Sequence, residues 1–239
     1  MLAICERKGL SGGSDAGRDP DSPTMRINIG CGQTPTAGWM NFDNSPSVRL
    51  AKLGRIADCV FRLGLLDRSQ YEFVKFAQAN NVEYGDATKG LPIRDEAVEV
   101  LYSSHMLEHL DRREAVLFLK EARRVLAPGG VIRLAVPDIR KLAEQYVSGG
   151  DADAFVESTL LWTSTPRTFP ERLRFLIVGS RNHRWMYDGS SLSKLLSQHG
   201  FINVKVLDPG MTMIENPASL DLHERDSDSV YVEAIRPIP

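Results

Sequence analysis

The sequence has few cysteines and no long apolar run, and each shortage excludes a class of protein. Only three of its 239 residues are cysteines, namely Cys5, Cys31 and Cys59, and no two of them form a Cys-x-x-Cys pair. Three scattered cysteines cannot build a disulfide framework, so we expect a reducing, cytoplasmic setting. No apolar run approaches the roughly 20 residues that a transmembrane helix needs, so we expect no membrane span.

The chain also lacks an excess of charge of either sign. Its 29 Lys and Arg residues nearly balance 31 Asp and Glu residues, and the net charge is -2. Proteins that bind nucleic acid or acidic membranes through their overall field are usually strongly basic, so neither is an expected partner. The length and the 42% hydrophobic content are those of one or at most two soluble domains.

Apolar residues are scarce at the start of the chain. Residues 9–24 are mostly Gly, Ser, Asp and Pro, and the continuous apolar stretch of a signal peptide is missing. Such a composition buries too little surface to offset the entropy of ordering. We therefore expect a flexible tail over residues 1–24 and one domain over residues 25–239.

The rest of the chain alternates short apolar strand patterns with helical patterns. Apolar spacing predicts two short helices between residues 47 and 80, broken near residues 64–67, and another helix at residues 190–199. This alternation predicts an α/β fold, a Rossmann-like, doubly wound, mostly parallel sheet with an antiparallel last strand and helices on both faces. The expected strands are residues 26–29, 39–43, 82–84, 97–102, 131–136, 201–208 and 228–237.

One further helix has clearly marked ends. Asp111 and Glu114 have the spacing of a capping box. Arg123 and Arg124 fall in the expected last turn, where the helix dipole favours cations. The Ala-Pro-Gly-Gly run at residues 127–130 then stops the helix.

Small and polar residues follow the expected strands at their carboxyl ends, where doubly wound sheets bind ligands. A Gly-x-Gly turn lets backbone N–H groups approach a ligand, although a plain turn between two strands remains an alternative. An acid at the second strand end suits the two hydroxyls of a ribose, although Asp is also common in turns. In chain order these residues are Gly30, Cys31, Gly32, Asp43, Asp86, Ala87, Ser103, Ser104, His105 and Asp138.

An ordered set of segments resembles the class I S-adenosylmethionine-dependent methyltransferases. The segments are RINIGCG, MNFD, VEYGDATKGLP, LYSSHMLEHL, RRVLAPGGVIRLAVPD and LLSQHGFINVKV, which together extend from about residue 25 to residue 237. The SSHMLEHL and LAPGG forms resemble the branch of predicted methyltransferases of glycan and small-molecule pathways, the type 11-like group. The resemblance implies S-adenosylmethionine as cofactor and methyl transfer to an oxygen or nitrogen atom of a small molecule or glycan.

The resemblance also implies roles for individual residues. Asp43 would hold the ribose of the cofactor, and Asp86 with Ala87 would hold the adenine. The methionine portion would lie against Ile29, Gly30, Cys31 and Gly32, and the reactive methyl near Ser103 and Ser104.

Two features depart from the family pattern. Asn28 stands where the family usually has an acid, and the short connection from Gly32 to Asp43 contains Pro35 and Gly38. A parallel crossover with its helix needs about 10–12 residues or more, so we expect a single turn or a loop there.

Residues 105–109 match the His-x-x-Glu-His pattern of zinc-binding helices. That chemistry needs both histidines in mid-helix and a further ligand downstream, whereas here they follow a strand and precede the Asp111 cap. We therefore expect no metal. His109 or Glu108 would fix the loop through hydrogen bonds, or His105 would act at the methyl-transfer site.

Methyl transfer from a sulfonium mainly requires alignment of the acceptor with the methyl group. An oxygen or nitrogen acceptor can also need a base, and histidine suits that role near neutral pH. The candidate catalytic residues are His105, Asp138 and His183, with a hydrogen-bonded loop histidine as the alternative for His183.

The long connection over residues 150–188 is expected to be a lid or an acceptor-binding segment, or alternatively a homodimer surface. Trp185 and Tyr187 are expected to serve in packing. The candidate contacts to a sugar or a phosphate-bearing acceptor are Phe155, Trp162, Arg167, Arg172 and Arg174.

Two other functions remain open from the sequence. An NAD(P)-dependent oxidoreductase would share the fold, but the third glycine of its Gly-x-Gly-x-x-Gly fingerprint would fall at Pro35. A non-catalytic cofactor-binding module is the other alternative, suggested by Asn28 and the short first crossover.

Overall fold

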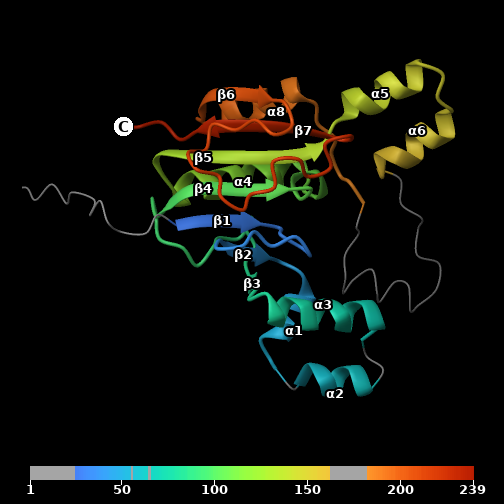
Figure 1. Ribbon diagram of the computed structural model, residues 1–239, viewed down its shortest axis with the longest axis vertical. Coiled ribbons are helices and arrows are strands. Elements are labelled where there is room, and N and C mark those ends of the chain that lie inside the picture. Colours follow the sequence, from blue (N-terminus) through green and yellow to red (C-terminus); the bar gives the residue numbers. More distant parts are fainter. Residues whose placement is uncertain (1–24, 55, 64–65, 162–181) are drawn as a thin grey trace, which may run out of the picture.

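The computed structural model describes residues 25–54, 56–63, 66–161 and 182–239, so the expected tail at residues 1–24 lies outside the described residues. Seven strands form one sheet in the order β3-β2-β1-β4-β5-β7-β6 (Figure 1). The strands from β3 to β5 are parallel, and β7 is antiparallel to both of its neighbours. The strands are β1 (Met25–Ile29), β2 (Met40–Asp43), β3 (Glu83–Tyr84), β4 (Val98–Ser104), β5 (Leu126–Pro137), β6 (Ile202–Leu207) and β7 (Ser229–Ile235). The expected doubly wound α/β sheet is confirmed.

Helices pack around this sheet, and the one with the clearest sequence signals begins as expected. The Asp111 side chain accepts hydrogen bonds from the N–H groups of Arg113 and Glu114. The Glu114 carboxylate in turn accepts from the Asp111 N–H, which completes the capping box. The helices are α1 (Pro46–Ala51), α2 (Ile56–Arg62), α3 (Arg68–Ala79), the 3₁₀ turn η1 (Leu107–His109), α4 (Arg112–Val125), α5 (Ile139–Val147), α6 (Ala152–Thr159) and α8 (Gly189–Gln198).

The main core lies between one face of the sheet and the helices α4 and α8. Alternate strand residues such as Ile27, Leu101 and Leu134 are fully buried there, because side chains of a strand point to opposite faces in turn. Helix α4 contributes Phe118 and Leu119 to the same cluster. Helices α1, α2 and α3 form a second, smaller cluster with residues that adjoin β1 and β3.

The opposite face of β4 and β5 is covered by the connection between β6 and β7, residues 208–228, which we call the β6–β7 cover. Ile214 and Leu220 of the cover pack against Trp39, Val100 and Tyr102. In Figure 1 the cover is the orange-red trace that crosses β5 and β4 toward β1. Residues 30–39, all of them described, contain no helix, so the expected loop replaces the first crossover helix.

The structure differs from the sequence expectation at three elements. The stretch expected to hold two helices holds three, α1 to α3, and residues 64–65 at the expected break are outside the described part. Helix α5 lies in a stretch for which no element was predicted, and α6 lies within the expected long connection of residues 150–188. Asp138 caps α5 and Asp151 caps α6. The apolar residues Ile139, Leu142 and Tyr146 of α5 have helical spacing, although none of its residues is fully buried. Strand β5 begins earlier than expected, at Leu126, which pairs with Val98 of β4, and the backbone of Gly129 and Gly130 pairs with Arg236.

None of the helices within the described ranges combines the length and the apolar character needed to cross a bilayer.

Candidate functional site

The carboxyl ends of β1, β2 and β3 are joined by backbone hydrogen bonds. The N–H groups of Gly30 and Cys31 both donate to the carbonyl of Phe42, over 2.8 and 3.1 Å. The Gly85 N–H donates to the carbonyl of Asp43 over 3.2 Å. The residues predicted from successive strands therefore lie along one edge of the sheet, with Asp43 and Asp86 at neighbouring strand ends.

The glycine turn is hydrogen-bonded directly to Asp43, the acid predicted to hold the ribose. The Gly32 N–H donates to Asp43 Oδ2 over 3.1 Å, and the Ser45 N–H donates to Oδ1 over 2.8 Å. At Gly30, with φ +72°, an added Cβ would lie 2.5 Å from Met106 Cγ. At Gly32, with φ +50°, an added Cβ would meet no described atom within 4 Å. The turn is thus closely packed at its first glycine and open at its second.

Two buried asparagines hold the loop that follows this turn. Asn28 Nδ2 donates to the Thr34 carbonyl and to Thr36 Oγ1, over 3.2 and 3.1 Å. Asn41 accepts from the Thr36 N–H over 2.8 Å and donates to the carbonyls of Thr36 and Trp39. Asn28 therefore fixes the loop, which explains an amide at the position where the family pattern has an acid.

Asp86 is held by residues of its own turn. Its carboxylate accepts from the Thr88 N–H and hydroxyl over 3.0 and 2.6 Å, and it pairs with Lys89 Nζ over 2.7 Å. Burial acts to raise the pKa of Asp86, but the Lys89 ammonium and the Thr88 donors outweigh it, so the pKa is lowered. Ala87 is buried in the main core beside it.

Ser103 and Cys31 are buried at the same edge. The Ser103 hydroxyl donates to the Ile29 carbonyl over 2.8 Å and ties β4 to β1, and Ser104 ends β4 with a buried hydroxyl. Burial, with the Asp43 charge as a second cause, raises the pKa of the Cys31 thiol to about 12. Cys31 is therefore a neutral packing thiol and not a nucleophile.

The three candidate catalytic residues have different surroundings. His105 follows β4 with φ +49°, and its Nε2 lies 2.9 Å from Ser229 Oγ. Asp138 caps α5 and accepts from the Arg140 N–H over 2.9 Å. His183 is buried, and burial lowers the pKa of its ring more than the Glu108 carboxylate raises it.

The structure brings His105 and His183 together around Glu108, a residue that the sequence suggested only as a loop support. Glu108 Oε1 lies 3.4 Å from His105 Nδ1 and 3.9 Å from His183 Nε2. The HMLEH pattern indicated Glu108 and His109, but no local pattern indicated that His183 would join them.

Most of the predicted acceptor contacts lie outside the described residues. Of them, only Phe155 is described, and its ring stacks on Tyr146 with centroids 5.2 Å apart. Tyr187 is fully buried, as expected for packing, whereas Trp185 is partly exposed under the Arg112 guanidinium. The others, Trp162, Arg167, Arg172 and Arg174, lie outside the described residues.

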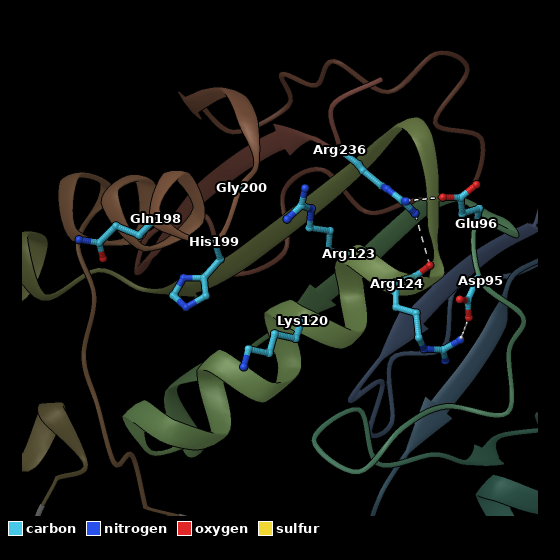
Figure 2. Close-up of a pocket in the computed structure, with 9 residues that line it drawn as sticks. All are labelled: Asp95, Glu96, Lys120, Arg123, Arg124, Gln198, His199, Gly200 and Arg236. Carbon is cyan, nitrogen blue, oxygen red and sulfur yellow. Dashed lines mark hydrogen bonds and ion pairs between the residues drawn. The ribbon is translucent and has the colours of Figure 1, made fainter. Parts of the chain in front are cut away.

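A hollow of about 620 Å³ lies at the opposite, amino edge of the sheet (Figure 2). Asp95 and Glu96 precede β4 and Arg236 follows the antiparallel β7, which puts them at that edge. Arg124 pairs with Asp95 and Arg236 with Glu96, so these cations are already neutralised. None of the predicted cofactor residues lines this hollow. Its lining residues are Asp95, Glu96, Lys120, Arg123, Arg124, Gln198, His199, Gly200 and Arg236.

Comparison with known proteins identifies the domain. A family model described as a methyltransferase domain matches residues 27–134, from β1 into β5. No curated protein matches the sequence.

Solved structures of similar fold are S-adenosylmethionine-dependent methyltransferases. A possible histamine N-methyltransferase from Thermotoga maritima is 17% identical over 89% of this chain and 82% of that one, with a TM-score of 0.47. A methyltransferase from Methanosarcina mazei is 14% identical over 90% of this chain and 93% of that one, also with a TM-score of 0.47. Phosphoethanolamine N-methyltransferase 2 from Haemonchus contortus is 12% identical over 90% of this chain and 49% of that one, with a TM-score of 0.46.

Residues 27–134 therefore match a methyltransferase domain, and the protein is an S-adenosylmethionine-dependent methyltransferase. Its cofactor is S-adenosylmethionine.

Proposed function

We propose that the carboxyl edge of the sheet binds S-adenosylmethionine and that the enzyme methylates an oxygen or nitrogen atom of a small molecule or glycan. The observation that carries this proposal is the hydrogen bond of 3.1 Å from the Gly32 N–H to Asp43 Oδ2, beside the open space at Gly32. When bound, the cofactor supplies an activated methyl group on a sulfonium. The residues of the chain then need only to bind the cofactor, align the acceptor with its methyl group and deprotonate the acceptor.

Asp43 is suited to the ribose because its carboxylate keeps acceptor capacity. An ionised carboxylate has about four lone-pair sites, and Gly32 and Ser45 occupy two of them. The remaining sites can accept from two neighbouring hydroxyls. The backbone of residues 29–32 would line the methionine portion, because the open side of Gly32 leaves room for it.

We assign the adenine to Asp86 and Ala87, one strand further along the edge. The lowered pKa keeps the Asp86 carboxylate ionised and able to accept from an exocyclic amine. The Lys89 side chain that pairs with Asp86 is 75% exposed, so it can turn toward solvent when a ligand arrives. Ser103 and Ser104, at the end of β4, would line the neighbouring part of the cofactor.

The loop after the glycine turn favours a methyl donor over a nicotinamide dinucleotide. A dinucleotide places its pyrophosphate at the N-terminus of the helix that follows the turn. Residues 30–39 are all described and form no helix, so that anion site is missing. A sulfonium is a cation and does not need it.

We propose His105 as the base for the acceptor. It directly follows β4, and Ser229 orients its ring through Nε2. Asp138 is bound as a helix cap, and His183 has Nδ1 2.8 Å from a backbone carbonyl, so both are held in place by the backbone. We also propose that the 150–188 segment binds the acceptor, because its described residue His183 lies next to the β4 end.

Calorimetry with S-adenosylhomocysteine tests the cofactor site. Hydrogen bonds to a charged group contribute about 1.5–3 kcal/mol, so Asp43→Ala is expected to weaken binding about 10- to 100-fold. The matched control is Asp208→Ala, which removes an exposed carboxylate after β6 and is expected to leave affinity unchanged.

Two results would contradict the proposal. One is a wild-type protein that binds neither S-adenosylmethionine nor S-adenosylhomocysteine, and the other is equal weakening by both substitutions. A fluorescence titration with NADH is expected to show no binding. Extracts incubated with isotopically labelled cofactor, analysed by mass spectrometry, would identify the acceptor as the compound that gains one labelled methyl group.

A further inference from the structure

Three of the five histidines of the chain converge on one buried carboxylate. The Glu108 side chain is 1% exposed, and neither of its oxygens accepts a hydrogen bond from any described residue. Its Oε1 lies 3.4 Å from His105 Nδ1, 4.0 Å from His109 Nε2 and 3.9 Å from His183 Nε2. A buried carboxylate without a hydrogen-bond partner is energetically costly, so a bound ligand would explain its presence here.

Hydrogen bonds at Nδ1 of His109 and His183 determine that Nε2 of each ring faces Glu108. His109 Nδ1 lies 3.2 Å from the Asn182 carbonyl, and His183 Nδ1 lies 2.8 Å from the Thr159 carbonyl. A carbonyl only accepts, so each Nδ1 carries a proton and each neutral ring presents the Nε2 lone pair. Two nitrogen lone pairs and a carboxylate oxygen therefore face one another, at separations too long for direct hydrogen bonds.

The backbone holds these groups in a fixed arrangement. The Glu108 carbonyl accepts from the N–H groups of Arg184 and Trp185, over 2.7 and 3.2 Å. The His183 N–H donates to the carbonyl of Leu160, just after α6. A histidine that binds a metal characteristically donates its other ring N–H to a carbonyl or carboxylate, as His109 and His183 do.

We propose that Glu108, His109 and His183 bind a divalent transition-metal ion of the zinc type. The three ligand atoms lie within 4.8 Å of one another, and a modest contraction would give zinc bonds of about 2.0–2.2 Å. Two imidazoles and one carboxylate suit zinc or cobalt better than magnesium or calcium, which prefer oxygen ligands. A fourth position remains for water or an acceptor atom, as in zinc sites that take part in reactions.

No metal was expected from the sequence, because zinc-binding HMLEH-type patterns lie in mid-helix. The structure has His109 and Glu108 in the short turn η1 and supplies the missing downstream ligand from His183. His105 is not among the three ligands. Its Nδ1 lies 3.4 Å from Glu108 Oε1, without a hydrogen bond between them.

Metal binding stands independently, and only its use in methyl transfer rests on the proposed function. The site adjoins His105 at the end of β4, where we propose that the acceptor is deprotonated. A bound divalent ion lowers the pKa of a coordinated hydroxyl or water, so it would help an oxygen acceptor to lose its proton.

Titration of the chelator-treated protein with Co²⁺ tests the site, with calorimetry on Zn²⁺ as a second measurement. Cys5 and Cys59 are replaced by serine beforehand, because free thiols also bind these ions. We expect one equivalent of Co²⁺ with the visible absorption of a four-coordinate ion. Glu108→Gln and His183→Ala are expected to lose more affinity than the roughly 10- to 100-fold that a missing second-shell partner costs.

The matched control is His223→Ala, which removes a histidine whose side chain is 66% exposed and is expected to keep full affinity. Absence of stoichiometric binding by the parent protein would overturn the proposal, as would binding that survives both Glu108→Gln and His183→Ala. Should either variant fail to fold by circular dichroism, the half-exposed His109→Ala serves in its place. S-adenosylhomocysteine calorimetry on the same samples separates the two proposals, because either ligand can bind when the other does not.

Discussion

Gly30 and Gly32 have similar positive φ angles but different neighbours. Both have a backbone conformation that residues with a Cβ atom rarely adopt. At Gly30 the Met106 side chain also fills the space that a Cβ would take, whereas at Gly32 that space is open. The first glycine therefore serves packing, and the second serves access for a ligand.

Gly30→Ala is expected to destabilise the protein by about 2–4 kcal/mol, the sum of left-handed strain and overpacking. Gly38→Ala is the matched control, because Gly38 has φ +79° and open surroundings. Strain alone is expected there, about 1–2 kcal/mol. Urea unfolding measures both. If the two variants lose equal stability, Met106 does not restrict the turn, and a Met106→Ala change would then give no rescue.

The common position of the proposed cofactor-binding residues at one edge of the sheet could be predicted because each follows a strand directly. Gly30, Asp43 and Asp86 needed only the order of the strands and the rule that parallel strands end at one edge. The grouping of Glu108, His109 and His183 depends on the path of the chain after α6, for which the sequence contains no periodic pattern. The loop-fixing role of Asn28 likewise depends on contacts that only the fold creates.

The β6–β7 cover takes the place of a helix on the second face of the sheet, and a buried ion pair anchors it. Arg133 and Glu233 are both fully buried and lie 2.7 Å apart. The Glu233 carboxylate also accepts from the Thr212 hydroxyl and the Met213 N–H, over 2.7 and 2.6 Å. Arg133 donates to the Met211 carbonyl over 3.0 Å. The pair therefore binds the cover to β5 and β7.

Glu233→Ala is expected to cost about 3–5 kcal/mol of unfolding free energy, because it leaves a buried guanidinium without its partner. Faster hydrogen exchange is expected over residues 208–228. Glu72→Ala removes an exposed pair with Arg68 and is expected to cost no more than about 0.5 kcal/mol. A Glu233→Ala variant with native stability and unchanged exchange would show that apolar contacts alone hold the cover.

Elements with caps and strong apolar periodicity could be predicted, and others could not. Helix α4 has a capping box and a buried stripe, so both of its ends were correct. Helix α5 also has a cap and apolar residues at helical spacing, namely Ile139, Leu142 and Tyr146, but unlike α4 it buries no residue fully, and it was not predicted. The β6–β7 cover has no periodic pattern at all, because its side chains are fixed by contacts with distant strands.

For the whole molecule, several carboxyl groups have lowered pKa values that link stability to pH. Arg124 lowers the pKa of Glu121, and backbone N–H groups at the starts of α4 and α8 lower the pKa values of Asp111 and Asp188. Asp86 is lowered as well. A lowered folded-state pKa contributes stability above the unfolded value, and that stability is lost as the pH falls through the folded value.

We therefore expect the carboxyl contribution to stability to stay nearly constant from about pH 7 to pH 5 and to fall below about pH 4, where unfolded carboxyls titrate. The lowered pKa of buried His183 adds a loss of stability below the ordinary histidine value of 6.5. Urea unfolding across this range measures the effect. Glu121→Gln is expected to reduce the slope on the acid side, because it removes a carboxylate that accepts from Leu91 and Arg124. A slope that is identical in both proteins would exclude Glu121 as a contributor.

The sheet as a whole could be predicted because strands and helices alternate along the chain and the last strand was expected to be antiparallel. β6 and β7 are antiparallel neighbours that a short hairpin could join, yet the connection between them is the long β6–β7 cover, which packs on the second face of the sheet. That combination is a property of the assembled molecule, since neither segment shows it alone.

The position of β7 also has a consequence for synthesis. β7 lies between β5 and β6 although it follows both in the chain, and Arg133 and Glu233 are 100 residues apart. Until β7 has been synthesised, β6 has no strand to pair with and β5 keeps an open edge that can pair with other chains. We therefore expect the β5–β7 pairing, a non-local contact, to form late in folding.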